Sequence, residues 1–386
     1  MSEALKIGLN LVALSDQRSS GVEAFVKNVL GRVRVGSKGE ITIALRRTLP
    51  VREALGAQFI QENKNVLISR WRVKRTGFRV PIEMVLLSLK FFDCDTVLSV
   101  NNFGPLFGKA SQKRAVFIHD IWFLDPSYNG GLIKKLVFAL LIKIQLAHTH
   151  KVFTISAHSK TAIVNRLGVK ADKVVILPFV MEPPSLRRKY RTSTNSESGQ
   201  ESAKTDNSTP YLLLIGSDRA NKNVWNAIVG YIGFLRRGRV LGPDLVVVGQ
   251  FSTVYISKIT KLLDSVGMNR VKIFGFVTRS EYVDLMRAAQ GVVFLSLYEG
   301  LGIPVLEAIA ENKPILVSKG TVCQEIAGPL GIAVDGNKLK EIEGGYEQLA
   351  EFISKDQSYA ASHLKKYVDC EKGPRILKNF LLSEFI

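Results

Sequence analysis

The amino-acid sequence predicts an α/β protein made of two doubly wound domains, each a parallel sheet covered by helices. Short apolar runs rich in Val and Ile alternate with amphipathic stretches from one end of the chain to the other, which is typical of repeated strand–helix–strand units. The length of 386 residues suits two domains. A polar segment near the middle separates two halves of similar pattern.

The expected strands are short and mostly lack polar alternation, as strands buried on both faces of a parallel sheet do. In the first half they are Lys6–Val12, Ile41–Leu45, Val66–Ser69, Thr96–Val100, Ala115–His119, Val152–Ile155 and Val174–Leu177. In the second half they are Tyr211–Ile215, Leu245–Val248, Lys272–Phe274, Gly291–Leu295, Pro314–Val317 and Gly331–Val334. Helical patterns lie between many of them, as in Gly21–Val33, Ile82–Phe92 and Ser280–Ala289.

The domain boundary is expected at Glu182–Pro210, because this segment is rich in Ser, Thr, Asn and Lys and nearly free of apolar residues. We expect an N-terminal domain over residues 1–182, a linker over 183–210, a C-terminal domain over 211–355 and a helical tail over 356–386 that returns to the N-terminal domain.

Composition excludes several classes of protein. With 46% hydrophobic and 23% charged residues, the chain is globular rather than disordered. The three cysteines are too few and too scattered for a disulfide framework or a zinc site, which favours a reducing compartment. The first twenty residues lack the pattern of a secretory signal, and no apolar run reaches the roughly 18 residues of a membrane span. We therefore expect a cytoplasmic protein.

Charge is the unusual bulk property. The formal net charge of +19 is concentrated in residues 1–182, which carry +14, against +5 for residues 183–386. The densest basic cluster runs from Lys64 to Arg79 without an acidic residue. Such a cluster suits nucleic acid, an anionic membrane surface or an anionic substrate, and a solvated face with no partner is the alternative.

The densest chemical signal is Tyr298–Ala310, YEGLGIPVLEAIA, directly after an expected strand. Glu299 therefore lies at the carboxyl end of a strand, where open α/β sheets bind ligands. Gly300 and Gly302 permit close backbone approach, and Pro304 suits the first position of a helix. The loop would then direct backbone N–H groups and a helix dipole at an anion.

Glu307 falls about one turn into that helix, eight residues after Glu299. By spacing alone the two glutamates cannot form a close acid/base pair, but they can accept hydrogen bonds from hydroxyl groups on either side of a bound phosphate. Such recognition is selective, because an unpaired buried acceptor is costly. The alternative is a strand–turn–helix with one capping carboxylate, which explains only one of the two glutamates.

The segment EGLGIPVLEA resembles the Glu-x7-Glu motif of the retaining glycosyltransferases of family 4, whose GT-B fold has two Rossmann-like domains facing a central cleft. The common form of the motif is EGFGLPVLEA, so Leu301 stands where Phe is usual. The resemblance is loose over residues 5–182 and good over residues 210–335.

This resemblance implies roles for the motif residues. Glu299 would be a catalytic residue that binds hydroxyl groups of the donor sugar, and Glu307 would bind the ribose. The backbone amides of Gly300, Leu301 and Gly302 would bind the donor diphosphate.

The segment LLLIGSDRANKNV resembles the opening strand of the family's second domain, where an Arg and a Lys bind the donor diphosphate. Lys222 matches the family Lys. The two usual positions of the Arg hold Ser217 and Asn221, while Arg219 lies two positions early. The resemblance therefore leaves two possibilities: Arg219 reaches the phosphates through a shifted loop, or Lys222 acts alone.

Two segments of the first half also carry the resemblance. SSGVEAFVKNVL is similar to the family's glycine-rich turn, which would place Ser20 and Gly21 near the acceptor or a phosphate. VFIHDIWFLDP ends a strand with His119 and Asp120. Family members with this pair have the His beside the donor sugar, which implies a catalytic role for His119. Considered without the resemblance, a His at the end of a strand more often has a structural role.

Together these resemblances imply a retaining glycosyltransferase that moves a hexose, with mannose suggested by the His-Asp pair, from a nucleotide-sugar donor to a saccharide or lipid-linked acceptor in surface polysaccharide or glycolipid synthesis. No metal site is readable and no cofactor is expected. The basic first half and Ile82–Phe92 predict peripheral contact with anionic lipid at the inner face of the cell membrane.

Two alternatives belong to other classes. One is a GT-B enzyme of different chemistry, an epimerase or a phosphorylase, and the missing signature of a cofactor lysine argues against it. The other is a nucleic-acid-binding protein, and the absence of a recognised nucleic-acid module makes nucleic acid an unexpected partner.

Overall fold

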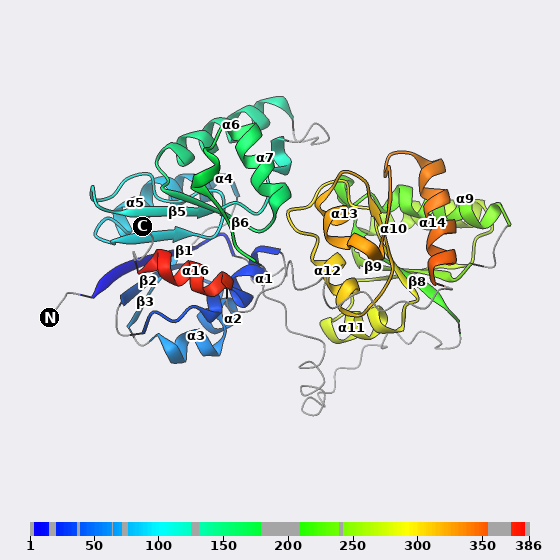
Figure 1. Cartoon of the computed structure of the whole chain (residues 1–386), viewed down its shortest axis with the longest axis horizontal. Coiled ribbons are helices and arrows are strands. Elements are labelled where there is room, and N and C mark those ends of the chain that lie inside the picture. Colours follow the sequence, from blue (N-terminus) through cyan, green and yellow to red (C-terminus); the bar gives the residue numbers. More distant parts are fainter. Residues whose placement is uncertain are drawn as a thin grey trace. The chain divides into compact units, whose positions relative to one another are not determined.

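The computed structural model describes residues 4–14, 21–36, 39–63, 65–71, 76–124, 131–178, 209–238, 242–353 and 372–382. The chain forms two compact units, one of Met1–Met181 with Val368–Ile386 and one of Glu182–Tyr367. In each unit, helices pack against a parallel sheet (Figure 1).

The sheet of the first unit has seven strands in the order β3-β2-β1-β4-β5-β6-β7. Every neighbouring pair is parallel, and the strand order reverses between β1 and β4. The strands are β1 (Leu5–Leu11), β2 (Gly39–Arg46), β3 (Val66–Trp71), β4 (Thr96–Ser99), β5 (Lys113–Phe117), β6 (Lys151–Thr154) and β7 (Val174–Ile176).

The helices of the first unit are α1 (Gly21–Asn28), α2 (Val51–Leu55), α3 (Ala57–Glu62), α4 (Thr76–Pro81), α5 (Leu87–Lys90), α6 (Leu132–Ala147), α7 (Ala157–Leu167) and α16 (Lys372–Leu381). Short 3-10 turns are η1 (Leu30–Arg32), η4 (Trp122–Leu124) and η5 (Ala171–Lys173). Helix α16 is held by its apolar side, since Leu377 and Phe380 are buried and the Phe380 ring lies 5.4 Å from that of Phe153 in β6.

The sheet of the second unit has six strands in the order β10-β9-β8-β11-β12-β13, again all parallel. The strands are β8 (Tyr211–Ser217), β9 (Asp244–Gln250), β10 (Val271–Gly275), β11 (Gly291–Phe294), β12 (Ile315–Ser318) and β13 (Gly331–Val334). The helical elements are η7 (Ala220–Lys222), α9 (Val224–Arg236), α10 (Thr253–Ser265), α11 (Arg279–Ala288), α12 (Ile303–Ala310), α13 (Val322–Ala327), η8 (Gly328–Leu330) and α14 (Leu339–Ile353).

Two buried tyrosines fix the helix pair that covers one face of the second sheet. Tyr231 of α9 donates a hydrogen bond to the Pro243 carbonyl at 2.8 Å, and Tyr346 of α14 donates one to the Ala227 carbonyl at 3.0 Å. Their rings pack edge to face with centroids 5.5 Å apart. Because both hydroxyls are satisfied, these large side chains fill the core without a polar desolvation cost.

The prediction of two doubly wound parallel-sheet domains is confirmed, and each predicted strand coincides with an observed one to within two residues at either end. The helices were predicted less well. Ile82–Phe92 begins as a π-helical turn, η3 (Ile82–Leu86), directly after Pro81, which has no backbone N–H to donate. The predicted helix Gly21–Val33 ends at Asn28 and is followed by η1.

Several predictions fall outside the described residues. They concern most of the linker and the first part of the tail, Ser20, and the basic residues Lys64, Arg72, Lys74 and Arg75. Among the helices in the described part of the chain, none has both the length and the hydropathy required to cross a membrane.

Candidate active site

The predicted site residues of the second unit lie at the carboxyl edge of its sheet, where the strand order reverses. Strands β8 and β11 are hydrogen-bonded neighbours at this reversal. The turn η7 follows β8 and carries Lys222, and the loop after β11 carries Glu299. Two segments far apart in the sequence therefore meet where doubly wound sheets bind ligands.

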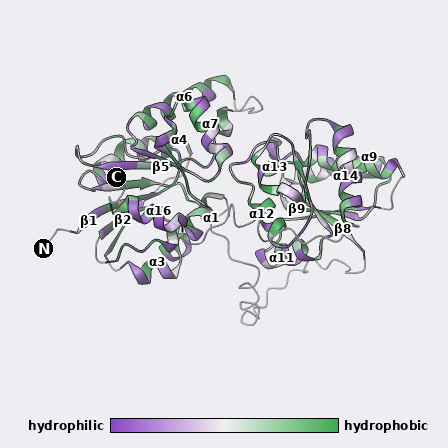
Figure 2. Cartoon of the chain, viewed as in Figure 1, coloured by the Kyte–Doolittle hydropathy of each residue, from purple (hydrophilic) through white to green (hydrophobic). Residues whose placement is uncertain are grey.

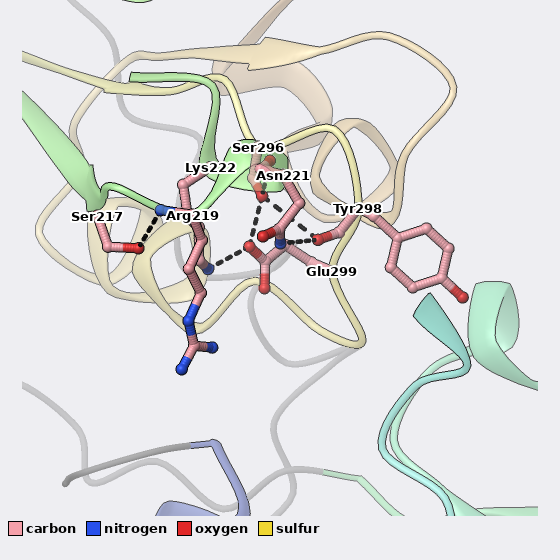
Figure 3. Close-up of polar contacts among 7 residues, drawn as sticks. All are labelled: Ser217, Arg219, Asn221, Lys222, Ser296, Tyr298 and Glu299. Atoms are coloured by element: carbon pink, nitrogen blue, oxygen red, sulfur yellow. Dashed lines mark hydrogen bonds and ion pairs between the residues drawn. The ribbon is translucent and has the colours of Figure 1, made fainter. Parts of the chain in front are cut away.

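An ion pair joins these two loops (Figure 3). The Lys222 ammonium donates to Glu299 Oε1, and the Ser296 hydroxyl lies 2.6 Å from the same carboxylate oxygen. Both side chains of the pair are partly buried, with 22% of Lys222 and 17% of Glu299 exposed. The ammonium also lies 5.2 Å from the centroid of the Phe294 ring. A pair in this setting is screened less by salt than one on the open surface.

Asparagine side chains hold the two loops in register. Asn221 donates to the Tyr298 carbonyl at 3.1 Å, and the Leu297 amide donates to the Asn221 carbonyl at 2.7 Å. Asn223, in a left-handed conformation before α9, donates to the Gly336 carbonyl at 2.7 Å. The positions of Lys222 and Glu299 are therefore fixed by contacts of the loop backbones as well as by their own charges.

The start of α12 is built by a glycine in a conformation that other residues rarely adopt. Gly302 has φ +75°, and a β-carbon there would lie 2.8 Å from the Cys323 sulfur. Pro304 occupies the second position of α12, not the predicted first, because Ile303 begins the helix. Leu301 is buried, and the N-terminus of α12 begins three residues after Gly300 in the loop that carries Glu299.

Glu307 has partners that the sequence interpretation missed. Its buried carboxylate accepts a hydrogen bond from the Tyr282 hydroxyl at 2.7 Å, and Arg279 Nη2 lies 2.5 Å from the other oxygen. Both partners come from the first turns of α11, whose start is fixed by a capping box between Thr278 and Glu281. That capping box, just after a strand end, is the sequence signal that could have located them.

The alternative in which a glutamate merely caps α12 is wrong. The residue before α12 is Gly302, and no side chain caps the helix. The Glu299 carboxylate is instead engaged by Lys222 and Ser296, and Glu307 lies inside the helix.

Arg219 stands apart from the ion pair. Its backbone amide donates to the Ser217 hydroxyl at 3.4 Å. In Figure 3 no hydrogen bond or ion pair joins its side chain to the other residues drawn. The guanidinium therefore does not take the place of Lys222 beside Glu299.

In the first unit, His119 follows β5 with its ring buried. Its Nε2 lies 3.2 Å from the Val100 carbonyl and must carry the proton, since a carbonyl can only accept. The ring packs against Phe25 and Phe117, with centroids 5.5 and 4.3 Å away. Burial lowers the pKa of His119 to about 3, so the imidazole is neutral at physiological pH.

The remaining predicted residues of the first unit lie around α1 and α7. Gly21 is the first residue of α1, and Ser20 precedes the described range. Ser156 caps α7 by accepting from the Ser159 amide, while the Ser159 hydroxyl donates to the His119 carbonyl at 3.3 Å. Over the described ranges, no group of three His, Cys, Asp or Glu side chains is arranged to hold a metal ion.

Known proteins are similar to this chain in sequence and in fold. The sequence model of the family "Glycosyl transferases group 1" matches residues 197–360. The O-antigen chain mannosyltransferase RfbU of Salmonella typhimurium is 25% identical over 284 residues, covering 71% of this chain and 71% of the relative.

Solved structures resemble the whole chain. Anabaena HepE in complex with UDP and glucose has a TM-score of 0.66 at 16% identity, over 98% of this chain and 100% of that one. The lipopolysaccharide outer core galactosyltransferase WaaB in its apo form has a TM-score of 0.65 at 15% identity, over 99% of this chain and 100% of that one. The structural likeness shows the fold, which is that of GT-B glycosyltransferases. The family match includes Lys222, Glu299 and Glu307, and supports a glycosyltransferase.

Replacing Tyr282 by Phe should weaken binding of nucleoside diphosphate by roughly threefold to tenfold, because Glu307 loses one of its two partners. Arg279 still holds the carboxylate, so binding should not be abolished. Isothermal titration calorimetry of the variant measures the change.

Tyr346→Phe is the matched control, because it removes a buried tyrosine hydrogen bond from the α9–α14 contact of the same unit. It should lower the melting temperature and leave nucleotide affinity unchanged. Equal affinity losses in both variants would mean that Tyr282 acts through general stability and not through Glu307.

The His119 ring should make the protein less stable in acid. Because its folded pKa is depressed, the stability that it contributes is present above the unfolded pKa near 6.5 and is lost as the pH falls toward 3. Between pH 7 and pH 5, wild type should lose about 2 kcal/mol of unfolding free energy relative to His119→Asn. Urea unfolding at both pH values measures this, and a constant difference between the two proteins would contradict a neutral, buried ring.

Proposed function

We propose that this protein is a retaining glycosyltransferase of the family 4 type that transfers a hexose, specifically mannose, from a nucleotide-sugar donor to a saccharide or lipid-linked saccharide in surface polysaccharide synthesis. The name of the relative RfbU, an O-antigen chain mannosyltransferase, supports the sugar and the pathway class. The spacing of the two glutamates supports the family.

The observation that carries the proposal is the Lys222–Glu299 ion pair beside the N-terminus of α12. A cation and a helix N-terminus suit a diphosphate, and an adjacent carboxylate suits the hydroxyl groups of the sugar attached to it. As the sugar leaves, negative charge grows on the diphosphate, and fixed positive groups stabilise that charge. Lys222 and the Gly300, Leu301 and Gly302 amides supply them, with Arg219 as a second cation.

The environment of Glu307 supports a different role. Its carboxylate is buried and oriented by Tyr282 and Arg279, so it is prepared to accept hydrogen bonds from ribose hydroxyls without reorganising. Glu299 and Glu307 thus contact two different parts of one donor molecule.

In this proposal the donor competes with Glu299 for Lys222. The ammonium and the carboxylate satisfy each other in the structure. A bound diphosphate would draw the ammonium toward itself and leave Glu299 oxygens available for the sugar hydroxyls. The ion pair thereby keeps both groups partnered until donor arrives.

The first unit supplies the acceptor side of the proposal. His119 would act as a catalytic residue with a neutral ring, and Ser20 and Gly21 would lie near the acceptor or a phosphate. A lipid-linked acceptor would bring the enzyme to the inner face of the cell membrane. The proposal includes no metal ion and no cofactor.

A panel of UDP-, GDP-, ADP- and dTDP-sugars tests the function. We expect GDP-mannose to raise the melting temperature, since ligand at a hundred times its Kd stabilises the folded state by about 2.7 kcal/mol. Release of nucleoside diphosphate should require an acceptor, and proton NMR of the product should show a retained anomeric configuration. If no nucleotide-sugar stabilises the protein or is consumed, the proposal fails; conversion of the sugar without acceptor would identify an epimerase instead.

Replacing Glu299 and Glu307 by Gln, one at a time, should change donor binding and turnover in different ways. Glu307→Gln should weaken binding of both nucleoside diphosphate and sugar donor, because both contain ribose. Glu299→Gln should leave nucleoside diphosphate binding intact or slightly tighter, since Lys222 is released from its partner, yet lower kcat by about a hundredfold or more. Calorimetric titration and steady-state kinetics check both outcomes.

Melting temperatures of the two variants serve as the control for folding. Equal affinity losses for nucleoside diphosphate in both variants would overturn the division of roles. Unchanged affinity and unchanged turnover in both would overturn the assignment of the motif itself.

A further inference from the structure

Helix α6 of the first unit carries a row of exposed apolar side chains. Their exposed fractions lie between 37% and 80%, and the residues are Leu132, Ile133, Leu136, Val137, Leu140 and Ile144. From Ile133 onward they recur at spacings of three and four residues, so they share one side of the helix. Figure 2 shows α6 with both hydrophobic (green) and hydrophilic (purple) segments along its ribbon.

The opposite side of α6 is already used by the fold. Ile142 and Leu146 are buried in a core cluster with residues of β5, β6 and α7. A helix that is apolar on all sides is normally covered on all sides. The described part of the chain covers only one side of α6, and the outer row is an exposed apolar stripe of the kind that marks an interaction surface.

The charge around this stripe indicates the chemistry of the partner. From residue 126 to residue 171 the chain has seven Lys and Arg and no Asp or Glu. This stretch contains α6 and α7, which pack into the same core cluster. Lys134 and Lys143 are exposed between the outer apolar residues of α6 itself. An apolar stripe on a stretch of chain with basic and no acidic side chains matches a surface that is both apolar and anionic.

We propose that the outer side of α6 docks on an anionic phospholipid bilayer, with its apolar side chains entering the headgroup region and Lys134 and Lys143 meeting lipid phosphates. Amphipathic surface helices bind membranes in this way, through buried apolar area together with attraction to anionic lipid. The inference rests on the proposed function only in that a lipid-linked acceptor would lie at such a surface.

A second copy of the chain suits this surface less well. Two α6 helices placed face to face would bring the lysines of one copy against those of the other, in a region without acidic residues. Like charges in contact oppose association. The bilayer has the opposite charge and is therefore the occupant that the surface favours.

The segment η3–α5 of the same unit also carries exposed apolar side chains. Met84 of η3 belongs to the core cluster that holds Ile142 of α6. Val85, Leu86 and Leu89 are exposed on η3 and α5. The segment Ile82–Phe92, for which the sequence predicted lipid contact, thus packs in the same cluster as α6, the longer of the two helices.

Flotation of the full chain with vesicles tests the proposal without donor or acceptor. Wild type should float with vesicles of phosphatidylglycerol and phosphatidylcholine and much less with phosphatidylcholine alone. The pair Leu136→Ser and Leu140→Ser should lower the partition coefficient roughly tenfold or more. The matched control, Val254→Ser with Leu339→Ser, replaces exposed apolar residues of the other unit and should change nothing.

A charge series completes the test. Lys134→Gln with Lys143→Gln should weaken binding several-fold at physiological salt, and Lys261→Gln with Lys340→Gln should not. Wild-type binding by the leucine variant would overturn the proposal, and so would a wild-type dimer that becomes monomeric on the same leucine substitutions. Vesicle binding needs no nucleotide-sugar, so the two proposals are tested independently. A negative flotation result would overturn only the membrane-docking proposal, and a negative result with the nucleotide-sugar panel would overturn only the glycosyltransferase proposal.

Discussion

The ion pair between Lys222 and Glu299 is the contact on which the candidate active site depends. The two residues are 77 positions apart and meet because β8 and β11 are neighbours at the reversal of strand order. Partial burial makes the pair sensitive to loss of either member, since the remaining charge would lack its partner in a less polar setting. Hydrogen bonds between uncharged groups also hold the surrounding loops, from the Asn221 side chain to the Tyr298 carbonyl and from the Asn223 side chain to the Gly336 carbonyl.

The second carboxylate of the motif is held on a different principle. Glu307 is inside α12 and contacts Tyr282 and Arg279 of α11, whereas Glu299 is in a loop and contacts Lys222 and Ser296. One carboxylate is thus positioned by two neighbouring helices and the other by side chains of two loops. Two carboxylates only eight residues apart in the sequence are therefore held by different kinds of contact.

The sequence predicted the two sheets well because strands buried on both faces leave short uninterrupted apolar runs, and every predicted strand was found. It predicted the position of Glu299 and Glu307 from their place after β11. It missed Arg279 and Tyr282, because their contact with Glu307 joins α11 to α12: the capping box of Thr278 and Glu281 marks where α11 begins but not which residue α11 contacts. The exposed side of α6 was missed for another reason: when both sides of a helix are apolar, periodicity cannot tell which side the protein covers.

The position of α16 affects the order in which the two units can fold during translation. The first unit is assembled from residues at both ends of the chain, and the second unit is inserted between them. Until the last residues leave the ribosome, the surface that receives Leu377 and Phe380, including Phe153, stays uncovered. The inserted unit can fold as soon as its own strands have emerged, so the part of the protein made first is the part completed last.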